Sequence, residues 1–535
     1  MAVVVEDKVV KSTCQDLNIP DVDAAEFFVE KFRTFEDRTA LVDYATGSTF
    51  TYSELEDVGH RVGAGLQRLG FQPGQRTGIH SGNSHDCLLA VLGTILAGGT
   101  LVFAKAALTP RELRYQFEDA QPDVVFCDQA NASKTLETCK FIPSVKTLVV
   151  FGSHDGFVSF GKLKCCSRSD FFPVPKRDAG DALVIMYSSG TTGLPKGVLI
   201  SNENFIIMCL LPSHESVQCA SRDDVYLCAA PLMHLSGLWS TCFFFATGSC
   251  VLLLTAPEPE LVFPAIEKYK TTTMITFPTV AHKLLQSPLI DAHDIGSMKE
   301  IIIGGSPMPS VVAKRLIAKF NIGYFRQGYG MTETSGMVTI TPPNHCEHGN
   351  VGKPVPLCQV KVVDVENGEK LGPYKHGELR VKGPGCVQGY LNMPKGATDL
   401  YDAEGFLKTG DLGYYDEQGS FYIVDRMKAL IKCMDQQVAP AELEDLLLQH
   451  WAVKDAAVAG VPHKEYGEAP RAFLVLDPAA AGKVTEGELS RIVAENLAPH
   501  KHLYGGVEFV ESIPKLDTGK NLRRALRDAY IRANC

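Results

Sequence analysis

The stretch Tyr187-Ser188-Ser189-Gly190-Thr191-Thr192-Gly193-Leu194-Pro195-Lys196-Gly197 follows directly on the apolar run Leu183 to Met186. It combines hydroxyl groups, glycines and one cation. Glycines let backbone N–H groups approach a ligand, hydroxyls donate hydrogen bonds, and an ammonium group neutralises negative charge. The stretch therefore predicts an anion-binding loop after a strand, with a surface turn rich in small polar residues as the alternative. It is not a Walker A loop, because Lys196 is preceded by Pro195 and followed by Gly197.

On both sides of this loop, from about residue 25 to residue 424, short β-branched runs alternate with longer amphipathic stretches. Met274 to Thr276 and Ile301 to Ile303 are examples of the short runs, and Val311 to Phe320 is an example of the long ones. This alternation predicts parallel sheets covered by helices, which is an α/β fold. Open α/β sheets bind their ligands where strands turn into loops, and the anion-binding loop has that position.

A smaller unit begins after the apolar run Phe421 to Val424. Pro440 suits the first position of a helix, and leucines recur on one face of the residues after it. Thr485 and Glu488 have the spacing of a capping box for a second helix. The sequence thus predicts two domains joined by a short hinge: a large N-terminal domain of layered sheets and helices, residues 1–424, and a small mobile α+β C-terminal domain, residues 425–535.

The composition restricts the partners. The 535 residues carry a formal net charge of −10, which opposes a polyphosphate backbone, so we expect no nucleic-acid partner. The uncharged stretch Cys87 to Ala104 is interrupted by Gly93 and by the Gly98-Gly99 pair. This favours a buried helix that runs into a turn and a strand over a membrane span. We expect a monomer or a weak homo-oligomer.

The sixteen cysteines include no C-x-x-C pair, which favours reduced thiols in an intracellular compartment. The apolar run Val3 to Val5 is followed at once by charged residues, so no signal-peptide core is predicted. The chain ends in Arg532-Ala533-Asn534-Cys535, which is not the Ser-Lys-Leu peroxisomal address. We therefore expect a cytoplasmic location, with the peroxisome as the alternative.

Six further blocks accompany the loop in a fixed order. They are Pro231-Leu232-Met233-His234, Gly304-Gly305-Ser306-Pro307, Gln327-Gly328-Tyr329-Gly330-Met331-Thr332-Glu333-Thr334, Thr409-Gly410-Asp411, Val424-Asp425-Arg426-Met427-Lys428 and Pro514-Lys515-Leu516-Asp517-Thr518-Gly519-Lys520. With the loop, they resemble the signature of the adenylate-forming superfamily, most closely its branch with 4-coumarate–CoA ligase and firefly luciferase. The resemblance implies an acid–thiol ligase: ATP activates a carboxylic acid, aromatic or fatty, as an acyl-adenylate, pyrophosphate leaves, and the acyl group passes to coenzyme A.

The resemblance also assigns the nucleotide contacts. The phosphates of ATP are expected at Ser188, Ser189, Gly190, Thr191, Thr192, Gly193, Lys196 and Thr332, with Mg²⁺ on Glu333. The adenosine is expected at Gly304, Gly305, Gln327, Gly328, Tyr329 and Gly330, and its ribose at Asp411 and Arg426. A lone carboxylate suits Mg²⁺, which keeps most of its waters and takes other ligands from phosphates. The alternatives are a solvated surface role for Glu333, a core role for Tyr329 and an Asx-turn at Asp411.

Lys520 is the expected catalytic residue, because a flexible ammonium near the end of the chain can bridge the carboxylate and the α-phosphate as charge builds. By resemblance, His234 gates the acyl pocket. The pocket itself is expected near Gly237, Leu238, Trp239, Ser306 and Met337. These residues are apolar or small, which favours an aromatic or aliphatic acid. The alternatives are an ordinary exposed lysine for Lys520 and, for His234, a buried histidine whose hydrogen bonds are all made within the core.

For the thioester step, the resemblance makes Asp425 the hinge and places Lys432 and Gln437 on a second face of the small domain. The family usually has Lys-Gly-Tyr/Phe-Gln at this turn, whereas this chain reads Met434-Asp435-Gln436-Gln437. Asp435 adds a β-carbon and a negative charge on the expected path of the pantetheine arm. Adenylation is thus the firmer prediction and ligation to coenzyme A the weaker one.

Three other functions fit the same motifs. A luciferase-like monooxygenase would oxidise the adenylate with O₂. A binding or scaffold relative with impaired ligation would keep the fold, although Lys196, Glu333, Asp411 and Lys520 are all intact. An enzyme that loads a carrier protein would need a carrier module, and the chain stops soon after Lys520.

Overall fold

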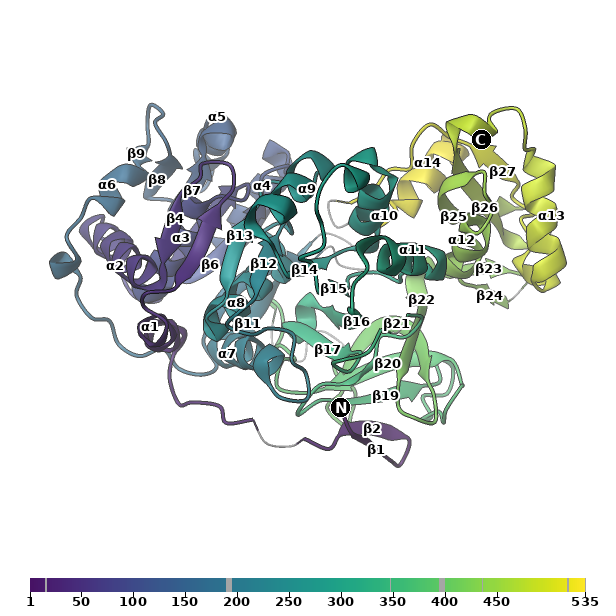
Figure 1. Cartoon of the computed structure of the whole chain (residues 1–535), viewed down its shortest axis with the longest axis horizontal. Helices are drawn as coiled ribbons and strands as arrows, with labels where there is room; N and C mark the ends of the chain where they lie inside the picture. The colour runs from purple at the N-terminus through teal and green to yellow at the C-terminus, as the bar shows by residue number, and fades with distance from the viewer. Residues whose placement is uncertain are drawn as a thin grey trace.

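The computed structural model in Figure 1 describes residues 1–14, 17–188, 195–346, 348–393, 400–434, 436–516 and 519–534. One sheet of seven strands carries the predicted anion-binding loop, which starts at the end of β10. Its order is β11-β10-β6-β5-β7-β8-β9, all parallel except β11. The bounds are β5 (Arg76–Ser81), β6 (Thr100–Lys105), β7 (Val124–Asp128), β8 (Thr147–Phe151), β9 (Val158–Ser159), β10 (Ala182–Ser188) and β11 (Lys196–Ser201).

A second sheet of nine strands has the order β18-β17-β16-β15-β14-β12-β13-β3-β4. Its six central strands are parallel and its outer strands are antiparallel. The bounds are β3 (Thr39–Asp43), β4 (Thr49–Thr51), β12 (Val225–Cys228), β13 (Cys250–Leu253), β14 (Thr273–Thr276), β15 (Glu300–Ile303), β16 (Tyr324–Met331), β17 (Gly336–Ile340) and β18 (Lys353–Pro354). The strands predicted at 183–186, 274–276 and 301–303 are thereby confirmed.

The largest apolar core joins residues of both sheets with helices that pack on them, including the five longer ones given next. These are α1 (Ala24–Thr34), α2 (Tyr52–Arg68), α3 (His85–Leu96), α7 (Asn202–Leu210) and α8 (Leu235–Thr247). Further cores join the nine-stranded sheet to α9 (Pro259–Tyr269), α10 (Pro278–Gln286) and α11 (Ser310–Phe320), and the seven-stranded sheet to α4 (Pro110–Ala120) and α5 (Ala132–Cys139). The short α6 (Phe160–Lys164) packs against α2. The predicted sheets covered by helices are confirmed.

The uncharged stretch 87–104 forms the buried helix, turn and strand that the sequence predicts. Helix α3 is buried from Cys87 to Leu96 and is about 18 Å long, short of a bilayer's ~30 Å. Gly98, with φ +74°, ends it. Gly93 does not interrupt the helix, contrary to our prediction. A β-carbon there would lie 2.3 Å from Val62 of α2, so glycine is needed where the two helices cross. Within the described residues, no helix is both long and apolar enough to cross a membrane.

A third sheet of six strands is antiparallel throughout, in the order β1-β2-β19-β20-β21-β22. Its bounds are β1 (Val3–Glu6), β2 (Val9–Ser12), β19 (Gln359–Val363), β20 (Gly377–Lys382), β21 (Leu407–Tyr415) and β22 (Phe421–Arg426). The prediction of parallel strands up to residue 424 is therefore wrong for this part of the chain. Tight hairpins connect β1 to β2 and β21 to β22, and such short connections permit only antiparallel neighbours.

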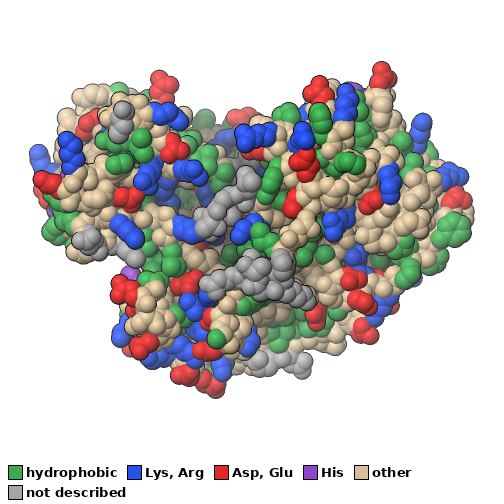
Figure 2. Space-filling view, turned by 180° about the vertical axis from the view of Figure 1, so that it is seen from behind, with side chains coloured by type: hydrophobic (Ala, Val, Ile, Leu, Met, Phe, Trp, Pro, Cys, Tyr) green, Lys and Arg blue, Asp and Glu red, His purple; other side chains and the backbone are tan. Residues whose placement is uncertain are grey.

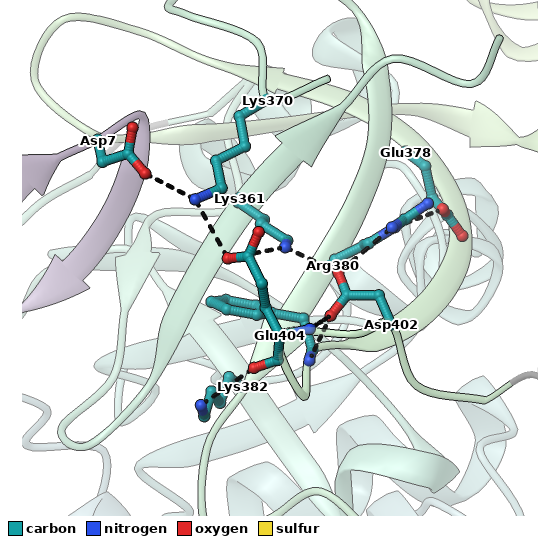
Figure 3. A network of polar contacts seen from close by, with 9 residues as sticks. Asp7, Lys361, Lys370, Glu378, Arg380, Lys382, Asp402 and Glu404 are labelled. Atoms are coloured by element: carbon teal, nitrogen blue, oxygen red, sulfur yellow. Dashed lines mark hydrogen bonds and ion pairs between the residues drawn. The ribbon is translucent and has the colours of Figure 1, made fainter. Parts of the chain in front are cut away.

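A network of ion pairs ties the third sheet together (Figure 3). The Lys361 side chain is only 3% exposed, and its Nζ lies 2.7 Å from Asp402 and 3.4 Å from Glu404. Lys370 connects Glu404, at 3.1 Å, to Asp7 in the turn between β1 and β2, at 2.7 Å. Burying a lysine this deeply requires such partners, because an unpaired buried ammonium loses its hydration without compensation.

The same network reaches the Thr409-Gly410-Asp411 block on β21. Arg380 donates to Glu378 at 2.9 Å and to Asp402 at 3.3 Å. The other carboxylate oxygen of Glu378 accepts the backbone N–H of Gly410 at 3.2 Å. The backbone just before Asp411 is therefore fixed by a carboxylate that is itself fixed by an arginine.

The small domain is built on a five-stranded sheet of order β24-β23-β26-β25, with β27 beside β26. Its strands are β23 (Ile431–Cys433), β24 (Gln436–Val438), β25 (Val453–His463), β26 (Gly467–Leu476) and β27 (Val507–Phe509), and its helices are α12 (Pro440–Leu448), α13 (Glu486–Asn496) and α14 (Arg523–Asn534). The predicted helix start at Pro440 is confirmed, and Thr485 caps α13 by accepting the N–H of Glu488. In Figure 1 this domain lies at the right, beyond β22.

Candidate functional site

A cavity of about 1100 Å³ lies between the large and small domains. Figure 2 shows the molecule from behind, with a hollow between its two lobes and lysine and arginine side chains beside it. The predicted site residues that line the cavity are Ser188, Lys196, His234, Trp239, Gly304, Gly305, Ser306, Gly328, Tyr329, Gly330, Thr332, Glu333, Met337, Asp411, Arg426 and Lys520. Blocks that are far apart in the sequence therefore meet at one place.

The end of the cavity at which phosphates are expected, called the phosphate end below, is formed where β10 ends and β11 begins. Ser188 is the last residue of β10, Lys196 is the first of β11, and Glu333 lies in the short helix η5 (Thr332–Thr334). The Ser188 hydroxyl donates to Oε1 of Glu333 at 3.0 Å. Glu333 is buried, so the alternative of a solvated surface carboxylate is wrong. The predicted contacts at Ser189, Gly190, Thr191, Thr192 and Gly193 lie outside the described residues.

Tyr390 belongs to this end of the cavity, and our sequence reasoning missed it. Its hydroxyl donates to the same Oε1 of Glu333 at 3.2 Å, and the Nζ of Lys196 lies 5.0 Å from the centre of its ring. Tyr390 follows Gly389 and lies outside all of the motif blocks given above. No spacing rule connects it to Glu333. The Gly389-Tyr390 pair itself was the signal in the sequence that could have pointed to this residue.

At the ribose end, Asp411 is almost fully buried between two partners. Its Oδ1 lies 2.6 Å from Nε of Arg426, and its Oδ2 accepts the hydroxyl of Tyr329 at 2.6 Å. Burial raises the pKa of Asp411, while the Arg426 guanidinium and the Tyr329 hydroxyl oppose that rise. Tyr329 lines the cavity and is half-buried, and its ring also packs against the core of the third sheet.

Four glycines of the predicted adenosine site line the cavity, and Gln327 does not. The four are Gly304, Gly305, Gly328 and Gly330. Gln327 is buried and its side chain donates to the carbonyl of Asn350 at 3.0 Å. Alternation along β16 would place Gln327 on the same face as Tyr329, but its amide is held by the Asn350 carbonyl and does not border the cavity. The prediction that Gln327 contacts the nucleotide is not supported by this geometry.

Lys520 reaches the cavity from the small domain. Burial lowers the pKa of Lys520 and the nearby Arg426 charge lowers it further, while Asp411 and Glu333 act in the opposite direction. The loop before Lys520 contacts the large domain closely at Gly519, which has φ +75°. A β-carbon at this position would lie 1.6 Å from Oγ1 of Thr279, so the contact requires glycine. The alternative of an ordinary exposed lysine is wrong for Lys520.

The two domains are held together by a small set of polar contacts besides this loop. Ser310 donates its N–H to Asp445 at 3.2 Å, and His282 contacts the carbonyl of Lys454 at 2.7 Å. At the boundary between the domains, near the end of β22, Asp425 accepts the N–H of Ala441 within the small domain at 3.1 Å. These contacts close the cavity on the side of the small domain.

The apolar part of the cavity lies next to His234. The Nδ1 of His234 accepts the N–H of Ser236 and caps α8, and its ring meets the edge of Phe277 at 5.8 Å between centres. Trp239 is 8% exposed and donates its indole N–H to the carbonyl of Met208 at 2.7 Å. This hydrogen bond fixes the plane of a large aromatic wall.

Two predicted pocket residues do not border this space. Leu238 is fully buried in the core, and a β-carbon on Gly237 would lie 2.2 Å from the carbonyl oxygen of Pro231. Helical periodicity explains the difference, since residues one apart on a helix face different directions, and Leu235, Ser236, Trp239 and Phe243 are the residues of α8 that border the cavity. Cys219 lines the cavity as well, although no motif pointed to it.

The predicted second face lies away from the cavity. Lys432 is exposed on β23, and its backbone N–H donates to Glu468 at 3.2 Å. The side chain of Gln437 and the whole of Asp435 lie outside the described residues. Lys520 and Lys432 thus occupy different surfaces of one small domain, so a single orientation brings only one of them into the cavity.

The site suits magnesium bound together with a nucleotide. Among the described residues, no group of three or more His, Cys, Asp and Glu side chains is arranged to hold a metal ion alone. Glu333 instead offers one carboxylate beside the hydroxyl of Ser188. Mg²⁺ prefers oxygen ligands, keeps several waters and is commonly held by one or two carboxylates plus phosphates. The oxygen donors present therefore fit Mg²⁺ shared with a nucleotide.

The family models match both domains. The model described as "AMP-binding enzyme" matches residues 28–391, and the one described as "AMP-binding enzyme C-terminal domain" matches residues 442–520. The chain belongs to the AMP-binding enzyme family. The expected adenylate-forming superfamily is thereby confirmed, together with its fold of a large N-terminal and a small C-terminal domain.

The relatives of this AMP-binding enzyme have two kinds of activity. It is 36% identical to a luciferin 4-monooxygenase of Luciola mingrelica, over 91% of each chain. It is 30% identical to 4-coumarate-CoA ligase 1 of Narcissus pseudonarcissus, over 99% of this chain and 98% of that one. Among solved structures, ATP-bound MatB from Rhodopseudomonas palustris matches with a TM-score of 0.85 at 29% identity, over 95% of this chain and 99% of that one.

Proposed function

We propose that this protein uses ATP to convert a carboxylic acid into an acyl-adenylate and then transfers the acyl group to coenzyme A. One observation carries the proposal: Lys520, buried carboxylates and an apolar pocket meet in one cavity. Adenylation must bring a carboxylate to the anionic α-phosphate, so it requires cations and pre-aimed donors next to an organic pocket. The similarity to 4-coumarate-CoA ligase 1 supports the same reaction class.

The nucleotide would lie across the cavity from Tyr329 to Lys196. Asp411 would accept the ribose hydroxyls, and Arg426 keeps that carboxylate charged and oriented. The Tyr329 ring would stack on adenine. Lys196 and the hydroxyl-rich loop would bind the β- and γ-phosphates. Mg²⁺, when bound at Glu333, would neutralise charge on the phosphates as pyrophosphate develops.

In the first step, a carboxylate oxygen of the acid attacks the α-phosphorus of ATP. The new bond joins carboxylate oxygen to phosphorus, and the bond from phosphorus to the β-phosphate oxygen breaks. Pyrophosphate carries away the bonding electrons. Lys520 would stay protonated and donate hydrogen bonds to the carboxylate and the α-phosphate as charge builds between them. Burial lowers the pKa of Lys520, because its ammonium group has lost part of its hydration in the cavity.

In the second step, the coenzyme A thiol loses its proton and its sulfur attacks the acyl carbon. A carbon–sulfur bond forms, the bond from that carbon to the phosphate oxygen breaks, and AMP leaves. We propose that the small domain, residues 425–535, rotates against residues 1–424 about Asp425 between the two steps. Lys432 and Gln437 would then replace Lys520 at the cavity. Asp435 would slow this step relative to adenylation.

The acid is proposed to be aromatic or aliphatic. Trp239, Phe243 and Met337 line the apolar part of the cavity. These side chains offer contact area but no charge for a second ionic group on the acid. His234, at the start of α8, would separate this pocket from the thiol path.

A screen of carboxylic acids with MgATP, with and without coenzyme A, tests both steps. Pyrophosphate release without coenzyme A measures adenylation, and AMP release with thioester formation in its presence measures ligation. The Lys520→Ala variant is the control, because it removes the ammonium and should abolish release with every acid. Absence of AMP release from the unmodified protein across aromatic and aliphatic acids would reject the proposal.

A luciferase-like monooxygenase is the second candidate, favoured by the 36% identity to a luciferin 4-monooxygenase. The two functions share the adenylation step and differ in whether O₂ or a thiol consumes the adenylate. Mixing the protein with MgATP, air and firefly luciferin separates them. Light emission would favour the monooxygenase, and darkness with AMP release would favour the ligase.

A further inference from the structure

We propose that Tyr390 is a positioning residue that sets both the metal-binding carboxylate of Glu333 and the phosphate-binding ammonium of Lys196. The inference rests on the proposed function, because it assigns magnesium and phosphates to those two groups. Three observations carry it: the segment around Tyr390 is fixed on both sides, its hydroxyl contacts Glu333, and its ring faces Lys196.

The backbone around Tyr390 is held by both elements of the phosphate end. On one side, Leu391 donates to the carbonyl of Gly197 at 2.7 Å, and Leu199 donates to that of Gly389 at 3.2 Å. On the other side, Val387 donates to the carbonyl of Glu333 at 3.0 Å. The segment therefore joins β11 to η5, and Tyr390 cannot move without moving one of them.

The hydroxyl of Tyr390 restricts how Glu333 can point. It donates to Oε1 at 3.2 Å, and the Ser188 hydroxyl donates to the same oxygen at 3.0 Å. Two donors on one oxygen restrict the rotation of the carboxylate and leave Oε2 as the oxygen that would be available to a metal ion. Burial raises the pKa of Tyr390, and the Glu333 charge raises it further, so the phenol remains a donor.

The ring of Tyr390 restricts where the Lys196 ammonium can lie. Its Nζ is 5.0 Å from the ring centre, within the distance at which a cation is attracted to an aromatic face. A lysine side chain has several rotatable bonds, so an exposed one would spend little time in any single position. The ring keeps the ammonium next to the Glu333 carboxylate, where magnesium and phosphates would meet.

Three variants separate these two actions from simple structural support. Tyr390→Phe removes the hydroxyl and keeps the ring, whereas Tyr390→Leu removes both. Tyr401→Phe is the matched control, because the Tyr401 hydroxyl donates to the carbonyl of Val387 and so holds the same segment without contacting Glu333 or Lys196. ATP binding is measured by titration calorimetry in Mg²⁺ at several concentrations and in EDTA.

We expect Tyr390→Phe to need about tenfold more Mg²⁺ for half-maximal ATP affinity, the size of one lost hydrogen bond to a charged group. Its ATP affinity in EDTA should stay within twofold of the unmodified protein. Tyr390→Leu should show the same magnesium defect and a further loss of about fivefold in EDTA, from the missing cation–π contact. Tyr401→Phe should match the unmodified protein in both media.

The inference is overturned if Tyr390→Phe has normal magnesium dependence, if Tyr401→Phe is equally defective, or if Tyr390→Leu binds ATP unchanged or more tightly in EDTA. Circular dichroism on each variant identifies any that fails to fold, and Tyr390→Phe then carries the test alone. These titrations need no acid and no thiol. A protein that binds MgATP but releases no AMP with any acid would reject the proposed function while leaving the role of Tyr390 open to the same measurement.

Discussion

Replacing Arg426 with leucine should shift the pH dependence of ATP binding. Nε of Arg426 lies 2.6 Å from a carboxylate oxygen of Asp411, whose side chain is 5% exposed. At that distance two unit charges attract by roughly 6 kcal/mol if the effective dielectric constant is about 20. The Arg426 side chain is 36% exposed, and both ions lose hydration, so about half of this energy remains. About 3 kcal/mol corresponds to roughly two units in the pKa of Asp411.

The direction follows from which form binds the ribose. The ionised carboxylate accepts both hydroxyls, whereas the protonated form has lost acceptor capacity. Burial already raises the pKa of Asp411, and removing Arg426 takes away the main opposing charge. ATP affinity should therefore fall as the pH is lowered, and in Arg426→Leu this fall should begin about two pH units higher than in the unmodified protein.

Titration calorimetry with ATP between pH 5.5 and about 9 measures the shift. Arg471→Leu is the matched control, since it removes an arginine that pairs with Glu508 at 2.9 Å in the small domain and does not line the cavity. The control should keep the pH profile of the unmodified protein. An Arg426→Leu profile that coincides with the unmodified one, or that is uniformly weaker without a shift, would refute the role given to the ion pair.

Lys520→Ala should lower the rate of acyl-adenylate formation about a thousandfold or more while ATP affinity changes little, as pyrophosphate exchange would measure. Because burial lowers the pKa of Lys520 below 10.5, the exchange rate should fall as the pH rises through that lowered value, and Lys520→Arg should move the fall to higher pH; a shared profile would contradict this. Lys361→Met should cost about 2 kcal/mol in urea unfolding, because Asp402 loses its closest cation and keeps Arg380 at 3.3 Å. The pKa of Asp402 is lowered to about 2, so its contribution to stability is present above about pH 4 and is lost toward pH 2. Trp239→Ala should raise AMP release with bulky acids relative to small ones by about tenfold; an unchanged preference would remove Trp239 from the pocket wall.

Much of the fold follows from local signals in the sequence. Pro440 and Thr485 mark helix starts because a proline fits the first helical turn and a threonine satisfies an unpaired N–H. The β-branched runs 183–186 and 301–303 form strands in the two large sheets. In both cases the information lies within a few residues, so no tertiary contact is needed to read it.

The antiparallel third sheet could not be predicted in this way. Its N-terminal hairpin, β1 and β2, pairs with β19, more than 340 residues along the chain. No spacing rule connects segments that far apart. The cost of closing such a loop depends only weakly on its length, so distant pairing is allowed but leaves no local signal.

For the site, the sequence identified which residues meet but not how each one points. Asp411, Lys196 and Glu333 line the cavity as predicted. The side chain of Gln327 is held by the Asn350 carbonyl, and Leu238 turns away because of its position on α8. Tyr390 was missed because its partners come from two other parts of the chain. Orientation depends on register and packing, which a motif does not encode.

The buried thiol of Cys219 has a consequence for an enzyme that makes an acyl-adenylate. Such an anhydride transfers its acyl group to a thiolate, and Cys219 borders the cavity in which it would be made. Burial raises the pKa of Cys219 to about 12, although Arg326 opposes the rise. At neutral pH roughly one such thiol in a hundred thousand is ionised. In the proposed reaction, the protein would therefore keep sulfur beside its product without becoming acylated, and a thiol from outside would accept the acyl group.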